Sequence, residues 1–354
     1  MTQIKERKAD HINICLNEKI EPGYNYWNDV KLIHNALPEI DIDDVDTTCS
    51  MLGRKLDFPL IVTAITGGFS GAKKINSNIA KACSELNIGM GVGSERAGID
   101  DVDTESYAVI KDYDVPLVIG NVGAPQLIKQ KNKRAYGPED IRKAQELIDA
   151  DYVAIHLNYL QEIVQPEGDT MAKGCYDAIR AAARECPLIV KETGAGIDND
   201  TVQKLSGIGI HAIDVAGMGG TSFSAVELYR ARDSKDDIRS NLGELYFDWG
   251  IPTPVVLGTV KTSLPLISSG GIRSGLDVAR SIVMGASCAG TANGILAEAM
   301  ESAEAVKKKL ITIREEFRAA MFLTGSATVK ELSNKKYITI GKTSEWIRGM
   351  KEWM

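Results

Sequence analysis

From residue 58 onward, short and nearly continuous hydrophobic runs alternate with longer stretches in which apolar and polar positions mix. The hydrophobic runs occupy residues 59–64, 88–92, 116–122, 152–157, 187–192, 211–216, 265–269 and 286–291. Strands that are apolar on both faces are typical of parallel sheets covered by helices. The mixed stretches at 73–86, 138–149, 174–185, 199–206 and 275–284 have the spacing of amphipathic helices. The pattern therefore predicts an α/β fold with a parallel sheet.

Eight strand–helix repeats over about 240 residues favour a closed (β/α)8 barrel, or TIM barrel, over an open sheet. We expect the barrel to span residues 58–325, with a polar and partly helical extension at 1–57 and a helical tail at 326–354. The extension is expected to contribute to a substrate site, and the tail is expected to pack on the barrel or on a neighbouring subunit. A Rossmann-type sheet is the alternative, but no GxGxxG motif opens a helix after the first strand.

The composition is that of a soluble globular protein, with 44% hydrophobic and 25% charged residues in a chain of 354. No apolar run approaches the roughly 20 residues of a membrane span, and no apolar stretch follows the start as in a secretory signal. Six cysteines occur without a CxxC pair, which favours reduced thiols and argues against a structural zinc site. We therefore expect a cytoplasmic protein.

The formal net charge of −7 argues against binding to nucleic acid or to an anionic membrane. An anionic ligand would therefore need a local cluster of positive side chains. Arg7, Lys8 and His11 lie within one turn on a predicted helix and face the same way. They suit a phosphate clamp, although the same residues would also be ordinary on a solvated terminal helix.

Polar groups or glycines follow each predicted strand, where the active sites of (β/α)8 barrels lie. The most unusual end places His156, Asn158, Gln161 and Glu162 directly after an apolar strand. Alone, this stretch is as consistent with a polar loop that carries a hydrogen-bonded core histidine as with part of an active site. The other polar or glycine-rich ends are 63–68, 91–96, 120–123, 190–194, 215–222, 268–275 and 290–293. Together the eight ends predict a functional site.

Two of the strand ends have more specific chemistry. The segment 270–275 (GGIRSG) opens a helix, so its free N–H groups and the positive end of the helix dipole suit a phosphate. Lys191 ends an otherwise apolar strand, which an electronegative ligand edge would explain, with a Schiff-base lysine as the alternative. The connection 222–254 carries a charged run and is expected to be either a solvated insertion or a mobile lid.

Taken in chain order, these residues resemble the type 2 isopentenyl-diphosphate delta-isomerases, the FMN-dependent enzymes of isoprenoid biosynthesis. The matching segments are Arg7-Lys8-x-x-His11, 63–68 (TAITGG), 93–96 (GSER), Gly120-Asn121, His156-Leu157-Asn158-x-x-Gln161-Glu162, Lys191, 219–222 (GGTS) and 270–275 (GGIRSG). They cover nearly the whole chain. Two positions depart from the family pattern, namely Glu95 where glutamine is expected and Ala216 where serine is expected.

The resemblance implies a (β/α)8 barrel that holds FMN at its mouth and interconverts isopentenyl and dimethylallyl diphosphate. It implies that the flavin contacts Thr63, Ala64, Ile65, Thr66, Ser94, Asn121, Lys191 and Thr221. It places the FMN phosphate on Gly271, Ile272, Arg273, Ala292 and Asn293. The implied substrate-binding residues are Arg7, Lys8, His11, Ser94, Glu95, Arg96 and Gln161, and the implied catalytic residues are His156, Asn158 and Gln161. Glu162 would bind Mg²⁺, NADPH would reduce the FMN, and the chain would form a homo-oligomer, either a tetramer or an octamer.

The implied reaction moves a double bond by one carbon, so a proton must be added to the terminal CH₂ and another removed from C2. No pair of carboxylates in the sequence stands out as the acid and the base. The resemblance instead implies that reduced FMN acts as the acid–base catalyst without net redox change. The alternatives are an FMN-dependent 2-hydroxy-acid oxidoreductase of the same barrel type and a non-catalytic flavin- or phosphate-binding protein.

Overall fold

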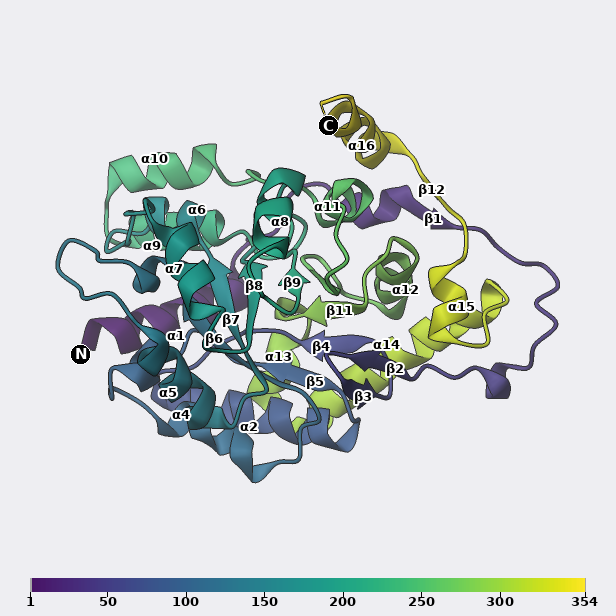
Figure 1. Cartoon of the computed structure of the whole chain (residues 1–354), viewed down its shortest axis with the longest axis horizontal. Helices are drawn as coiled ribbons and strands as arrows, with labels where there is room; N and C mark the ends of the chain where they lie inside the picture. Colours follow the sequence, from purple (N-terminus) through teal and green to yellow (C-terminus); the bar gives the residue numbers. More distant parts are fainter. Residues whose placement is uncertain (1, 354) are drawn as a thin grey trace.

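Eight parallel strands form a closed barrel in the order β10-β11-β4-β5-β6-β7-β8-β9 (Figure 1). The computed structural model describes the backbone of residues 2–353 and the side chains of residues 7–353. The barrel strands are β4 (Leu60–Val62), β5 (Gly89–Gly91), β6 (Val118–Gly123), β7 (Tyr152–Leu157), β8 (Leu188–Glu192), β9 (Ile213–Asp214), β10 (Leu266–Ser269) and β11 (Cys288–Thr291). Each strand coincides with a predicted hydrophobic run, and the predicted (β/α)8 barrel is confirmed.

Helices cover the outside of the barrel between successive strands (Figure 1). All five predicted helical stretches are helical, and they bury apolar side chains such as Ile75, Ile79, Val278 and Ile282. The longer outer helices are α2 (Ser70–Glu85), α5 (Pro138–Ile148), α7 (Cys175–Ala182), α8 (Asn199–Ser206), α11 (Thr253–Thr259), α12 (Gly275–Val283) and α14 (Ala303–Leu323). Shorter helical elements are α3 (Arg96–Ile99), α4 (Glu105–Ala108), α6 (Tyr159–Val164), α13 (Leu296–Glu301), α15 (Val329–Ser333), η1 (Tyr26–Asp29), η2 (Ile42–Asp44), η3 (Val109–Asp112), η4 (Ala124–Leu127) and η5 (Asn293–Ile295).

A small hairpin closes the barrel at the end where the strands begin. Its strands are β2 (Cys49–Met51) and β3 (Arg54–Leu56), which pair antiparallel. The buried side chains of Met51 and Leu56 pack there with Leu117 and other apolar residues from the starts of the barrel strands. The barrel is therefore filled at this end, and its polar residues gather at the carboxyl ends of the strands.

The two terminal segments of the chain lie side by side on one flank of the barrel. Strand β1 (Val30–Leu32) pairs antiparallel with β12 (Tyr337–Thr339), which is followed by α16 (Gly341–Glu352) (Figure 1). The strands β1, β2 and β3 fall in a stretch predicted to be irregular, because three residues are too few to show an alternating pattern. The tail thus packs on its own N-terminal extension.

The insertion after β9 is helical and borders the barrel mouth. It contains α9 (Phe223–Asp233) and α10 (Asp237–Leu245), which pack against each other and against α6 (Figure 1). Helix α1 (Thr2–Asn17) also lies on α9, and Ile14 and Ile20 pack there with Ala225 and Val226. No helix in the described part of the chain is long and apolar enough to span a membrane.

Candidate active site

A cavity of about 240 Å³ opens at the carboxyl ends of the barrel strands. It brings together side chains from α1, from the strand ends and from the insertion, which are far apart in the sequence. The sequence-predicted site residues that line it are Arg7, Lys8, His11, Thr63, Ala64, Ile65, Thr66, Ser94, Arg96, Asn121, His156, Asn158, Gln161, Glu162, Lys191, Thr221, Gly271, Ile272, Arg273, Ala292 and Asn293. Ala216, which departs from the family pattern, also lines the cavity and offers no side-chain donor.

Glu95 is the exception among the predicted site residues. Its side chain is fully buried beneath β6, and Oε2 accepts a hydrogen bond from the backbone N–H of Asn121 at 2.7 Å. A Cβ atom at Gly120 would lie 2.7 Å from this oxygen, so the glycine leaves room for the carboxylate. Burial raises the pKa of Glu95 to about 8. The predicted contact between Glu95 and the substrate is therefore corrected, because the side chain supports a strand end and does not face the cavity.

His156 is held in one orientation by Asn121. Its Nδ1 lies 2.7 Å from Oδ1 of Asn121, whose Nδ2 donates to the carbonyl of Val92 at 2.9 Å. Because the amide oxygen can only accept, Nδ1 carries the proton and Nε2 is left as an acceptor. Burial lowers the pKa of His156 to about 3, and the charges of Lys191 and Lys8 act in the same direction. His156 is therefore a neutral acceptor on the cavity wall, not a proton donor.

The first turn of α6 presents an amide–carboxylate cluster. Oε1 of Glu162 accepts from Nδ2 of Asn158 at 2.9 Å, and Oε2 accepts from the backbone N–H of Asp169 at 2.6 Å. Nδ2 of Asn158 also lies 3.2 Å from Oε1 of Gln161. Burial raises the pKa of Glu162, although these hydrogen bonds oppose the effect. Oδ1 of Asn158 is buried and has no partner among the described residues, so it is an acceptor available to a ligand.

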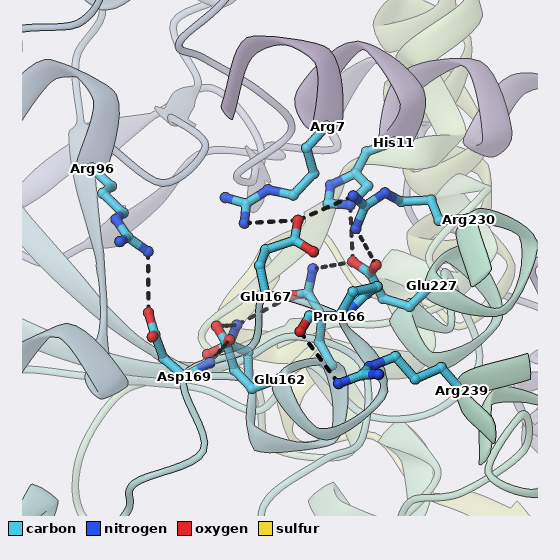
Figure 2. Close-up of polar contacts among 12 residues, drawn as sticks. Arg7, His11, Arg96, Glu162, Pro166, Glu167, Asp169, Glu227, Arg230 and Arg239 are labelled. Atoms are coloured by element: carbon cyan, nitrogen blue, oxygen red, sulfur yellow. Dashed lines mark hydrogen bonds and ion pairs between the residues drawn. The ribbon is translucent and has the colours of Figure 1, made fainter. Parts of the chain in front are cut away.

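Glu227 on α9 is a charged residue of the site that the sequence pattern did not reveal. Its carboxylate is completely buried and lies 2.9 Å from Nε2 of His11 (Figure 2). It also lies 3.1 Å from Nε2 of Gln161. Arg230 donates to the other oxygen at 2.5 Å. Burial alone would raise the pKa of Glu227, but His11, Arg230 and Gln161 outweigh it and lower the pKa to about 2. Glu227 is therefore an anion that holds His11 and Gln161 in place, although it does not itself line the cavity.

Cations of the site are paired with carboxylates on its rim. Figure 2 shows Arg7 directed at Glu167, at 3.5 Å, and Arg96 directed at Asp169, at 3.2 Å. Lys8 is half-buried and donates to the carbonyl of Ser94 at 2.8 Å. Burial, aided by the neighbouring Arg7, lowers the pKa of Lys8 to about 7. These side chains form a positive edge suited to an anionic group.

The opposite wall has the features of a phosphate site. Within residues 2–353 the backbone N–H groups of Gly271, Ile272 and Ala292 have no acceptor. Gly271 has φ +81°, and a Cβ atom there would lie 2.7 Å from the carbonyl oxygen of Gly219. Arg273 lies beside these groups and donates to that carbonyl at 2.9 Å. Free N–H groups, an arginine and the following N-terminus of α12 fit a phosphate group.

The loop after β8 is organised by a second residue that the sequence pattern did not reveal. Oε2 of Glu192 accepts from the backbone N–H groups of Thr193 and Gly194, both at 2.6 Å, and from those of Ala195 and Gly196. Burial raises the pKa of Glu192 to about 7 despite these hydrogen bonds. Thr193 and Gly194 line the cavity, whereas Glu192 does not. Glu192 therefore fixes the position of this part of the cavity wall through its hydrogen bonds to the loop backbone.

Close relatives of the chain carry one name. It is 44% identical over 345 residues to "Isopentenyl-diphosphate delta-isomerase" of Thermoplasma acidophilum, a match that covers 97% of this chain and 99% of the relative. The same name belongs to a protein of Methanothrix thermoacetophila that is 47% identical over 343 residues, with 96% and 94% of the two chains covered. The chain belongs to the isopentenyl-diphosphate delta-isomerase family.

Two further comparisons place this isomerase family member beside an FMN-dependent family model and solved barrel structures. The family model "FMN-dependent dehydrogenase" matches residues 175–339. A solved lactate oxidase of Pediococcus acidilactici has a TM-score of 0.64 at 13% identity, with 96% of this chain and 93% of that chain covered. A mandelate oxidase structure has a TM-score of 0.62 at 16% identity, with 96% and 98% covered. At these identities the structural likeness establishes the barrel fold alone.

Proposed function

We propose that this protein interconverts isopentenyl diphosphate and dimethylallyl diphosphate by a 1,3-allylic proton shift. The observation that carries the proposal is that one cavity has two separate edges suited to anionic groups. One is the N–H and Arg273 wall, and the other is the edge formed by Arg7, Lys8 and Arg96 beside Glu162. A phosphate-bearing cofactor and a diphosphate substrate would fill these edges together. Membership of the isomerase family supports this assignment.

FMN is the cofactor that the family model and the phosphate wall support. Gly271, Ile272, Arg273, Ala292 and Asn293 would hold its phosphate. Thr63, Ala64, Ile65, Thr66, Ser94, Asn121, Lys191 and Thr221 would contact its ring. Reduced FMN, when bound, would supply the acid and base that no pair of side chains in the cavity provides, with NADPH as its reductant.

The diphosphate would lie against Arg7, Lys8, His11, Ser94 and Arg96. Among the described side chains, no group of three or more His, Cys, Asp or Glu residues is arranged to hold a metal ion. Mg²⁺ commonly binds through one carboxylate together with phosphate oxygens of the substrate. We therefore infer that Glu162 receives Mg²⁺ with the diphosphate, and that the ion neutralises part of its charge.

His156, Asn158 and Gln161 would orient the hydrocarbon end of the substrate against the cofactor. His156 is neutral and fixed by Asn121, and Gln161 is fixed between Asn158 and Glu227. An alkene is a very weak base, so proton delivery requires close positioning in a pocket that excludes water. Rigid amides and a neutral imidazole meet this requirement without competing for the proton.

An FMN-dependent 2-hydroxy-acid oxidoreductase of the same barrel type is the second candidate. The two functions differ in redox stoichiometry. The purified protein should be incubated anaerobically with isopentenyl diphosphate, FMN, Mg²⁺ and a small amount of NADPH. We expect many equivalents of dimethylallyl diphosphate per NADPH consumed. Turnover without FMN or reductant, or oxidation of 2-hydroxy acids with no isomerisation, would overturn the proposal.

We also propose that the protein is cytoplasmic and forms a homo-oligomer, either a tetramer or an octamer, as the family resemblance implies. Size-exclusion chromatography with light scattering should give four or eight times the chain mass of 38.4 kDa. A monomer at micromolar concentration would contradict this proposal and leave the proposed activity untouched.

A further inference from the structure

A second and much smaller cavity, of about 20 Å³, lies inside the barrel below the main cavity. Four residues line both cavities and therefore lie between them, namely Thr63, Ala64, Asn121 and Lys191. The rest of the small cavity is apolar or glycine with one exception, which is the carboxylate of Asp214. A lysine and an aspartate therefore border the same small space.

Lys191 and Asp214 are aligned by the barrel itself. They are Cα partners on the neighbouring strands β8 and β9. Both are buried, with exposed fractions of 8% and 2%. Their side chains point inward together because paired residues on adjacent parallel strands share a face.

Each of the two charges keeps unused hydrogen-bonding capacity. Oδ1 of Asp214 accepts from Oγ of Ser269 at 2.5 Å and from the backbone N–H of Ala216 at 3.3 Å. Oδ2 has no partner among the residues that the structure describes. Nζ of Lys191 donates to the carbonyl of Glu192 at 2.7 Å, which leaves two of its three donors.

Lys191 is the charged residue that acts on Asp214, and the two are Cα partners, so they form a buried charge pair. A buried charge left without a counter-charge is strongly destabilising, so the pair explains how both residues are tolerated in an apolar barrel. Burial raises the pKa of Asp214, and the charge of Lys191 and the hydrogen bonds from Ser269 and Ala216 oppose this rise.

We propose that Asp214 and Lys191 form a buried charge pair beneath the flavin, and that Asp214 is a positioning residue that limits the positive charge felt by the reduced cofactor. This inference rests on the proposed binding of FMN. Reduction of a flavin adds negative charge, which a nearby lysine stabilises and a nearby carboxylate opposes. Asp214 would thus hold the reduction potential of the bound FMN below the value that Lys191 alone would set.

The test is the reduction potential of FMN bound to D214N, K191M and the double variant, measured against a reference dye. D214N removes the negative charge without changing side-chain size. We expect it to raise the potential by about 30 mV, which is a tenfold shift for a two-electron couple. K191M should lower the potential. In the K191M background, D214N should add little, because burial favours the neutral form of an aspartate that has lost its counter-charge.

D151N is the matched control, because Asp151 lies at the other end of the barrel and pairs with Arg54. It should leave the potential unchanged. An unchanged potential in D214N, or an equal shift with and without Lys191, would overturn the inference. If D214N does not fold, D214S takes its place, since serine also removes the charge, and an unchanged potential in D214S would overturn the inference. Failure of wild-type protein to bind FMN would instead overturn the proposed function.

Discussion

Nε2 of Gln161 donates a 3.1 Å hydrogen bond to the buried carboxylate of Glu227, which also accepts from Nε2 of His11 at 2.9 Å. These contacts join the first turn of α6, the insertion helix α9 and the N-terminal helix α1. Because the carboxylate only accepts, Gln161 must turn its NH₂ group toward Glu227 and its oxygen toward Asn158. Glu227 therefore decides which end of Gln161 is available to the substrate.

Glu227→Gln should reduce kcat/KM by about 10- to 100-fold, since a buried hydrogen bond to a charged group contributes about 1.5–3 kcal/mol. The variant can rotate its amide, so the orientation of Gln161 and the position of His11 would both be lost. Steady-state kinetics measure this effect, and flavin fluorescence should give an unchanged affinity for FMN. Glu167→Gln is the control, because Glu167 contacts Arg230 but is 42% exposed, and it should change kcat/KM by less than about threefold. Equal effects of the two substitutions would contradict the role given to Glu227.

Glu162→Gln should chiefly weaken the binding of Mg²⁺ and of the diphosphate, because the neutral amide is a poorer ligand for a hard cation. The Mg²⁺ concentration that gives half of the maximal rate should rise at least about tenfold. The FMN absorbance of the purified variant should be that of the wild type. Loss of FMN from this variant would mean that the stretch from His156 to Glu162 has been assigned to the wrong ligand.

The KM for isopentenyl diphosphate should rise as pH increases through about 7. Burial lowers the pKa of Lys8 to about 7, so the cation is fully present below this pH and is lost above it. The expected rise is up to about tenfold between pH 6 and pH 9, with Arg7 and Arg96 still charged. Lys8→Met should give a high KM that no longer depends on pH in this range. A pH-dependent KM in Lys8→Met would assign the titration to another group.

Gly271→Ala should lower the affinity for FMN by at least about tenfold. The glycine has φ +81°, and the added Cβ would press on the carbonyl oxygen of Gly219 in the proposed phosphate site. Gly285→Ala is the matched control, since Gly285 has φ +101° but an added Cβ meets open space. Both variants should lose similar thermal stability from backbone strain, and Gly285→Ala alone should keep its affinity for FMN. Equal loss of FMN in both would refute the phosphate site.

Much of the fold was predictable because barrel strands are apolar on both faces and the intervening helices are amphipathic. The site was predictable to the extent that barrel strand ends converge, which brought Lys191, His156 and Gly271 to one cavity. Glu227 was not predictable, because its contacts depend on how the insertion folds back on α6. The orientation of Glu95 was also not predictable. It depends on the space that Gly120 leaves for the carboxylate, and the spacing of residues in the sequence does not reveal this contact.

The source of the transferred hydrogen tests the central claim most directly. Isopentenyl diphosphate should be converted in D₂O by the FMN-loaded, reduced protein with Mg²⁺, and the early product examined by NMR and mass spectrometry. A proton shift predicts one solvent deuterium in a methyl group of dimethylallyl diphosphate, with far less than one NADPH consumed per product. Product that carries hydrogen from NADPH, or that forms only with stoichiometric NADPH oxidation, would contradict a redox-neutral isomerase.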